Sequence, residues 1–128
     1  MESLSAQHAD LQKAYAMLVP LIGMIDAGRA RQVLEKVSEG VSRHRAFRVL
    51  LDLTGVPFVD AQVADTLGLT SRAAALLGAR VYLVGVRPEI AMSLVGVDLG
   101  VTFSSLSAAL RELAPAGKRA RRAARRAR

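Results

Sequence analysis

The sequence contains no cysteine and no tryptophan, and it has only two histidines. Without cysteine the chain cannot form disulfides, bind zinc through thiolates or use a thiol nucleophile. His8 and His44 have no cysteine, histidine or carboxylate neighbours at metal-ligand spacing, so we expect surface roles for both and no metal site. Nothing in this composition requires an oxidising compartment, and we therefore expect a cytoplasmic protein.

Long apolar runs and glycine-rich loops are also missing. The longest uncharged apolar stretch near the N-terminus, residues 14–25, contains Pro20 and Gly23 and is too short to span a membrane. It has no basic leader, which argues against a signal peptide. No two glycines are adjacent and no glycine-rich loop precedes Lys-Ser or Lys-Thr, so we expect no phosphate cradle of the P-loop kind and no cofactor.

The positive charge of the chain is confined to its end. Residues 1–117 hold 11 Lys and Arg against 11 Asp and Glu, and residues 118–128 hold the other seven basic residues and no acidic one. A basic run of this kind is either a solvated tail or a segment that binds a polyanion, gaining affinity from counterion release. Its other residues are all alanine, which disfavours specific base readout.

Apolar periodicity predicts alternating strands and helices. We expect strands at residues 16–25, 47–53, 81–86 and 101–103, and helices at 4–18, 27–44, 60–77, 88–95 and 105–113. The expected inward faces of the two longest helices are Ala30, Val33, Leu34, Val37 and Val41 in one, and Val63, Ala64, Leu67, Ala74 and Leu77 in the other. Because parallel strands need long crossovers, this alternation predicts an α/β fold with a mainly parallel sheet.

Polar residues and glycine mark the expected helix ends. Asp26, Asp60 and Ser105 precede apolar helical patterns, where their side-chain oxygens can accept hydrogen bonds from free backbone N–H groups. Gly78 suits a left-handed C-terminal position, and Pro88 suits a first helical turn.

Three aspartates near the second strand are the nearest approach to an acid and base pair. Asp52 and Asp60 flank the turn at residues 54–58, and Asp65 lies one helical turn later. We favour structural roles, with Asp52 as a turn acceptor, Asp60 as a cap and Asp65 on a wet face. No nucleophile, base and anion hole can be assembled from these residues, so we expect no catalytic residues and no enzyme.

Three stretches together resemble the STAS domain, the anti-sigma factor antagonist fold, and most closely its stressosome R-type and S-type subunits. They are Val19-Pro-Leu-Ile-Gly-Met-Ile-Asp-Ala-Gly-Arg-Ala-Arg31, Leu51-Asp-Leu-Thr-Gly-Val-Pro-Phe-Val-Asp-Ala-Gln-Val-Ala-Asp65 and Leu77-Gly-Ala-Arg-Val-Tyr-Leu-Val-Gly-Val-Arg-Pro-Glu-Ile-Ala-Met-Ser-Leu-Val95. The resemblance implies a mixed, mainly parallel sheet of four to five strands with about four helices and an extra or replaced N-terminal element. It places the domain at residues 18–114, between an amphipathic segment at 1–17 and a basic tail at 115–128.

In that family the domain binds proteins, and a Ser or Thr directly after the helix-capping Asp is phosphorylated by a partner kinase. A phosphate there adds charge and bulk to a contact surface. Here the position after Asp60 is Ala61, which has no hydroxyl, and Ser93 aligns with a second phosphoacceptor of the R-type subunits. The resemblance implies a partner-binding surface made of Thr54, Val56, Phe58, Asp60, Gln62, Asp65, Arg87 and Glu89.

The leading hypothesis is therefore a non-catalytic STAS signalling or scaffold protein that binds other STAS subunits and a switch serine/threonine kinase. An exposed sheet edge also predicts a homodimer. One rival is a nucleic-acid or polyanion-binding protein acting through the tail, and another is a small-ligand-binding STAS module. The residues of the tail that would bind the polyanion are Lys118, Arg119, Arg121, Arg122, Arg125, Arg126 and Arg128.

Overall fold

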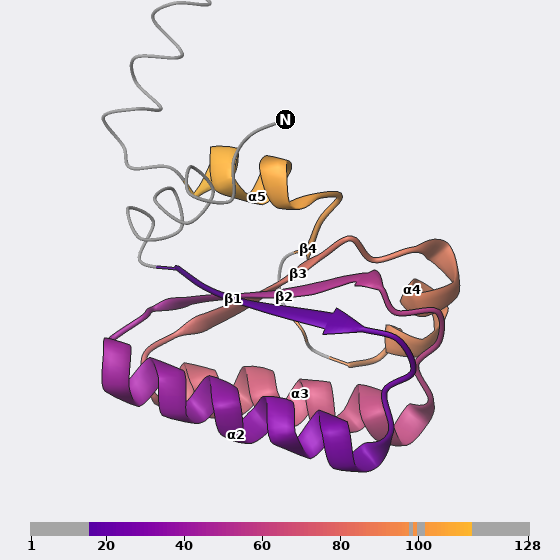
Figure 1. The fold of residues 1–128 in the computed structure, drawn as a ribbon, viewed down its shortest axis with the longest axis horizontal. Coiled ribbons are helices and arrows are strands. Elements are labelled where there is room, and N and C mark those ends of the chain that lie inside the picture. Colours follow the sequence, from indigo (N-terminus) through magenta and orange to yellow (C-terminus); the bar gives the residue numbers. More distant parts are fainter. Residues whose placement is uncertain (1–15, 98, 100–101, 114–128) are drawn as a thin grey trace, which may run out of the picture.

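The structure is a computed structural model that describes residues 16–97, 99 and 102–113 (Figure 1). Most of the expected N-terminal segment and all of the expected basic tail lie outside these residues. The predicted boundaries of the domain, at residues 18 and 114, stay a prediction, although the first strand already begins at Ala16.

Within the described residues, four parallel strands form the sheet in the order β1-β2-β3-β4. Their bounds are Ala16–Ile22, Arg48–Gly55, Arg80–Val84 and Thr102–Phe103. Neighbours in the sheet are also neighbours in the sequence, and each pair is joined by a crossover that contains a helix. The predicted alternation is confirmed, and it places all four carboxyl ends at one edge of the sheet.

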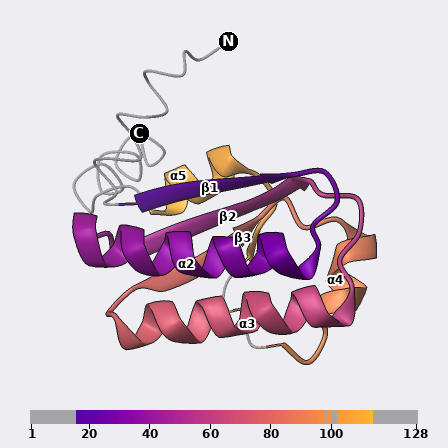
Figure 2. The same cartoon turned by 60° about the horizontal axis from the view of Figure 1, so that its bottom comes forward.

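Helices cover the two faces of the sheet unequally. The helices α2 (Ala27–His44) and α3 (Ala61–Leu76) lie side by side on one face, and α5 (Leu106–Glu112) lies on the other (Figures 1 and 2). The short helix α4 (Pro88–Leu94) sits beside the carboxyl edge. Strand residues alternate accordingly: Leu51 and Leu53 pack in the core under α2 and α3, whereas Leu50 packs in the smaller core with residues of α5.

Three predicted helix caps are confirmed by their hydrogen bonds. The backbone N–H of Arg29 donates to Asp26 Oδ1 at 2.8 Å, and that of Val63 donates to Asp60 Oδ1 at 2.8 Å. The N–H of Ala108 donates to Ser105 Oγ at 3.1 Å. Gly78 has φ +87°, as the left-handed helix end requires.

Several predicted details are wrong. The first strand ends at Ile22, three residues earlier than predicted. It lies at the edge of the described sheet, the position that Pro20 favours, with Pro20 and Ile22 exposed. Residues 16–18 belong to this strand, so the helix predicted over 4–18 cannot include them. Leu77 does not face the core, because α3 ends one residue before it and its side chain is 49% exposed. Leu34 is only partly buried.

Glycine allows β1 and α2 to approach closely. A Cβ built at Gly40 in α2 would clash with the sulfur and terminal methyl of Met17 in β1. Gly40 is buried, and Met17 packs against the larger core. The bare backbone of one helical turn therefore accommodates the thioether.

Candidate functional site

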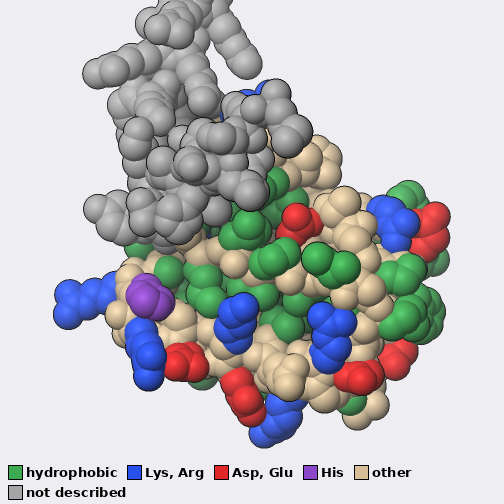
Figure 3. All heavy atoms as spheres, in the orientation of Figure 1, with side chains coloured by type: hydrophobic (Ala, Val, Ile, Leu, Met, Phe, Trp, Pro, Cys, Tyr) green, Lys and Arg blue, Asp and Glu red, His purple; other side chains and the backbone are tan. Residues whose placement is uncertain are grey.

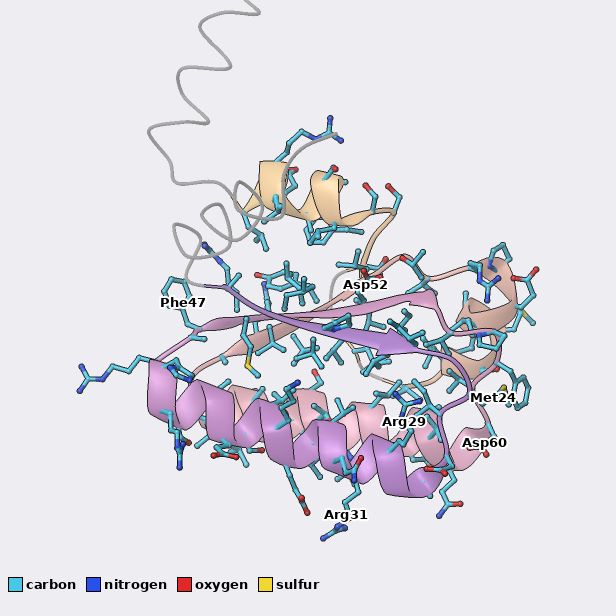
Figure 4. The ribbon with its side chains drawn as sticks, in the orientation of Figure 1. Met24, Arg29, Arg31, Phe47, Asp52 and Asp60 are labelled. Carbon is cyan, nitrogen blue, oxygen red and sulfur yellow. The ribbon has the colours of Figure 1, made fainter. Side chains whose placement is uncertain are left out.

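Three loops meet at the carboxyl edge of the sheet. They follow β1 (residues 23–26), β2 (residues 56–60) and β3 (residues 85–87). In parallel sheets this edge is where the loops from successive strands converge and where binding sites are commonly built. Figure 4 shows Met24, Arg29 and Asp60 at this end of the molecule.

Hydrogen bonds to backbone carbonyls fix these loops. Arg29 Nη1 donates to the carbonyl oxygens of Ile22, at 2.9 Å, and Met24, at 3.1 Å. Arg87 Nη2 donates to the carbonyl oxygen of Val56 at 2.5 Å, and so links the start of α4 to the loop before α3. The N–H of Gly23 donates to the Gly55 carbonyl oxygen at 2.9 Å. These hydrogen bonds therefore connect the three loops into one surface.

Arg29 is a residue that the sequence analysis missed as a functional candidate. A signal was present, because a cation in the first turn of a helix opposes the helix dipole and calls for another explanation. That explanation is the pair of carbonyl oxygens of Ile22, at the end of β1, and Met24, in the loop that follows.

Asp60 and Ala61 lie where the sequence predicts them. Asp60 caps α3, and Ala61 is the first residue of that helix, with its side chain exposed. A hydroxyl at position 61 would face solvent at a helix N-terminus. The exposed methyl group supplies no nucleophile and no hydrogen bond there.

Thr54 is exposed, but its polar groups are engaged. Its hydroxyl donates to Asp52 Oδ1 at 2.6 Å, and its N–H donates to the same oxygen at 3.0 Å. Across the strands, a Cβ at Gly85 would clash with the Thr54 side chain, and Gly85 has φ +71°. Glycine at position 85 is therefore required both for its backbone angle and for room.

Asp52 and Asp60 do not form an acid and base pair. Asp52 is on the sheet face that carries α5, since it alternates with Leu51 and Leu53, which pack on the other side. Asp60 lies at the start of α3, on the opposite side of the sheet (Figure 4). Both have structural roles: Asp52 accepts hydrogen bonds from Thr54 near the end of β2, and Asp60 caps a helix, as expected.

The expected partner-binding residues differ in their exposure to solvent. Phe58 is 53% exposed, and Asp60, Gln62, Asp65, Arg87 and Glu89 are not buried either. Val56 is a correction, because its side chain is completely buried and only its carbonyl takes part in the edge. Glu89 lies in the first turn of α4.

Ser93 lies near the end of α4 and is partly buried. The helix ends at Leu94, and Gly96 then turns the chain with φ +87°. The helix after Arg87 is thus only seven residues long. Ser93 therefore lies in α4, whereas Ala61 lies at the start of α3, and both helices are at the same edge of the sheet.

Exposed apolar side chains surround this edge, and the sequence analysis missed two of them. Met24, in the loop after β1, is 63% exposed, and Met92, in α4, is 76% exposed. They belong to the crossovers on either side of the one that carries Phe58. We call Met24, Phe58 and Met92 the apolar rim. Figure 3 shows hydrophobic side chains gathered at this end of the molecule, beside charged ones. Exposed methionine and aromatic side chains are typical of adaptable protein-binding surfaces.

The described residues offer little to other ligands. Within them, no three His, Cys, Asp or Glu side chains come close enough together to hold a metal ion. None of the described helices combines the length and apolar character that a bilayer crossing needs.

Comparisons with known proteins agree with the geometry. A family model described as the STAS domain matches residues 8–112. The chain is 41% identical over 114 residues to the RsbT co-antagonist protein RsbRA of Bacillus subtilis strain 168, covering 82% of this chain and 41% of that protein. It thus spans less than half the length of this relative.

Solved structures share the fold. A variant of RsbS from Moorella thermoacetica superposes with a TM-score of 0.66 at 24% identity, covering 77% of this chain and 86% of that one. A chain from a structure described as "Molecular architecture of the stressosome, a signal integration and transduction hub" has a TM-score of 0.58 at 24% identity, with 73% and 89% covered.

Proposed function

The chain belongs to the STAS domain family, and from this premise we propose that it is a non-catalytic signalling or scaffold subunit that binds other STAS-domain proteins through the carboxyl edge of its sheet. The observation that carries the proposal is the exposed start of α3, where Ala61 directly follows the capping Asp60 and is three residues after the exposed Phe58. This surface has the features of a docking site and lacks the groups of a reaction centre.

The similarity to RsbRA supports the choice of partner class. That relative is named an RsbT co-antagonist, and a chain of the same fold comes from a stressosome structure. We propose that this chain likewise assembles with STAS-domain subunits and meets a switch serine/threonine kinase. A cytoplasmic location is part of the same proposal.

The absent hydroxyl defines the role of the subunit within such an assembly. Phosphorylation at position 61 would add about two negative charges next to Asp60 and Asp65 and so repel a partner suited to the unmodified surface. With Ala61 that change cannot occur. The subunit then acts as a permanently unmodified binding surface, and any switch operates at Ser93 or on a partner.

A binding experiment with matched variants tests the docking surface. Phe58→Lys places a charge in the apolar rim, and Leu76→Lys places the same charge at the far end of α3, where Leu76 is 89% exposed. We expect Phe58→Lys to weaken binding to an STAS paralogue from the same host by at least about tenfold, the scale of a central interface residue. Isothermal titration calorimetry provides the measurement.

The matched control makes the result decisive. Leu76→Lys should bind like the unmodified chain, and both variants should keep the same circular dichroism spectrum. Equal losses in the two variants, or no loss with Phe58→Lys, would contradict docking at the carboxyl edge.

A further inference from the structure

Arg29 lies where helix electrostatics disfavour a cation. It is the third residue of α2, and the N-terminus of a helix carries a partial positive charge. Its side chain is exposed, so it adds little to the packing of the core. The reason for an arginine at this position must therefore be sought in its hydrogen bonds.

Those hydrogen bonds hold the loop after β1 at three points. The backbone N–H of Arg29 donates to Asp26 Oδ1 at 2.8 Å, where the loop ends. Arg29 Nη1 donates to the carbonyl oxygen of Ile22, the last residue of β1, at 2.9 Å. The same nitrogen donates to the Met24 carbonyl oxygen at 3.1 Å, in the middle of the loop, and Figure 4 shows Arg29 and Met24 at the same end of the molecule.

This loop presents the exposed thioether of Met24. Gly23 precedes it with φ +79°, and glycine leaves the backbone more freedom than other residues do. Ile25 follows it and is buried, with 5% of its surface exposed. Met24 thus lies between a freely turning residue and an anchored one, and the hydrogen bond from Arg29 fixes its carbonyl group.

The strength of these hydrogen bonds favours a role in binding over a role in stability. Both bonds from the guanidinium are exposed, so water competes for the same donor and acceptors and the net gain in folding is small. The unfavourable interaction of the cation with the helix dipole offsets part of that gain. A loop that is ordered before a partner arrives, in contrast, lowers the entropy that binding costs.

We propose that Arg29 is a positioning residue of the docking surface. It fixes the loop after β1 so that Met24 meets an STAS-domain partner in one arrangement. The inference rests on the proposed function and deepens it, because it names a residue whose effect on affinity passes through Met24 and not through direct contact with the partner.

Calorimetric titration of the full chain with an STAS paralogue from the same host tests the inference. Arg29→Gln should weaken binding about two- to tenfold, the scale of immobilising one flexible side chain. Its midpoint of urea unfolding should stay nearly unchanged, because removing the cation from the positive end of the helix offsets the lost hydrogen bonds. A clearly lower midpoint would make Arg29 a structural residue and overturn the inference.

Arg31→Gln is the charge-matched control. Arg31 lies two residues further along α2, is exposed, and pairs with Glu35 at 4.0 Å. This variant should bind like the unmodified chain. Equal weakening by Arg29→Gln and Arg31→Gln would mean that net charge matters and position does not, which would overturn the positioning role.

A double-mutant cycle with Met24→Ala separates positioning from direct contact. If Arg29 acts through Met24, Arg29→Gln should cause no further loss of affinity in the Met24→Ala chain, whereas a direct contact would give additive losses. In the free chain, NMR relaxation should show a lower backbone order parameter at Met24 in Arg29→Gln. Additive losses, or an unchanged order parameter, would contradict the proposal.

The same titrations distinguish this inference from the docking function. Weaker binding by Phe58→Lys together with unchanged binding by Arg29→Gln would leave the docking function standing and overturn the positioning role. No binding by the unmodified chain would overturn both.

Discussion

At the scale of single residues, the most consequential side chain is the methyl group of Ala61. It is exposed, at the first position of α3, directly after the capping carboxylate of Asp60. A hydroxyl here would need no rearrangement of the fold, since serine is readily accepted in a first helical turn. The identity of one exposed residue therefore decides whether this surface can carry a phosphate.

Substituting Ala61→Ser tests that statement. With a cognate switch kinase and ATP, we expect the unmodified chain to gain phosphate on Ser93 or on no residue, and Ala61→Ser to gain it at position 61 as well. Mass spectrometry of the digested protein locates the phosphate. Phosphate on Thr54 or Thr66 in either chain would move the switch elsewhere, and Thr54 is disfavoured because its hydroxyl is bonded to Asp52.

At the scale of elements, the loops at the carboxyl edge depend on two arginines. Arg87 precedes α4, and its guanidinium reaches the Val56 carbonyl in the loop before α3. This contact links the segment that carries Ser93 to the one that carries Phe58 and Ala61. The two halves of the proposed docking surface are therefore held in one arrangement.

Arg87→Ala should loosen that arrangement. Loss of one hydrogen bond to a backbone carbonyl is expected to lower the free energy of unfolding by about 0.5–1.5 kcal/mol. Urea unfolding measures this loss, and amide exchange should become faster in Val56, Phe58 and Val59. Arg72→Ala, which removes an exposed arginine from the middle of α3, is the control and should change neither quantity. Unchanged exchange in Arg87→Ala would mean that the loop is held by its other contacts.

The elements themselves were largely predictable because local signals agreed with tertiary packing. Asp26, Asp60 and Ser105 cap the helices that follow them, and the inward positions of α2 follow a helical period. The prediction failed where an apolar residue lies beyond the core, as with Ile22 at the end of an edge strand and Leu77 after the end of α3. Hydrophobicity alone does not reveal which strand becomes the edge or where a helix passes the limit of the sheet.

The candidate site was predictable only in part, for a related reason. Phe58 and Ala61 lie within the motif at residues 51–65. Met24 and Arg29 belong to a segment over 30 residues away in sequence, and the parallel order of the strands brings that segment to the same edge. Val56 was wrongly placed on the surface because turn residues are usually exposed. The structure buries its side chain and uses its carbonyl instead.

At the scale of the whole molecule, the features of interest lie at opposite ends of one sheet. The apolar rim lies at the carboxyl ends of the strands, and Arg48 and Arg80 lie at the amino ends of β2 and β3. Along the side, β1 is the outermost strand of the described sheet, with Pro20 and Ile22 exposed.

As the outermost strand of the described sheet, β1 predicts self-association. We expect multi-angle light scattering to show a concentration-dependent dimer, because an outer strand with exposed apolar residues gains by pairing or by being covered. Ile22→Lys should shift the equilibrium towards monomer, since a charged side chain on an edge strand opposes pairing, while Leu76→Lys should leave it unchanged. A monomer at all concentrations in the unmodified chain would exclude a homodimer.

The contact between Met17 and Gly40 has a chemical consequence for the same strand. The thioether of Met17 lies against a helix backbone that leaves no space even for a methyl group at position 40. Oxidation of methionine adds a polar oxygen to the sulfur. At Met17 this oxygen would lie against the Gly40 backbone unless the flexible side chain turned away, so the contact between β1 and α2 depends on the redox state of one sulfur atom.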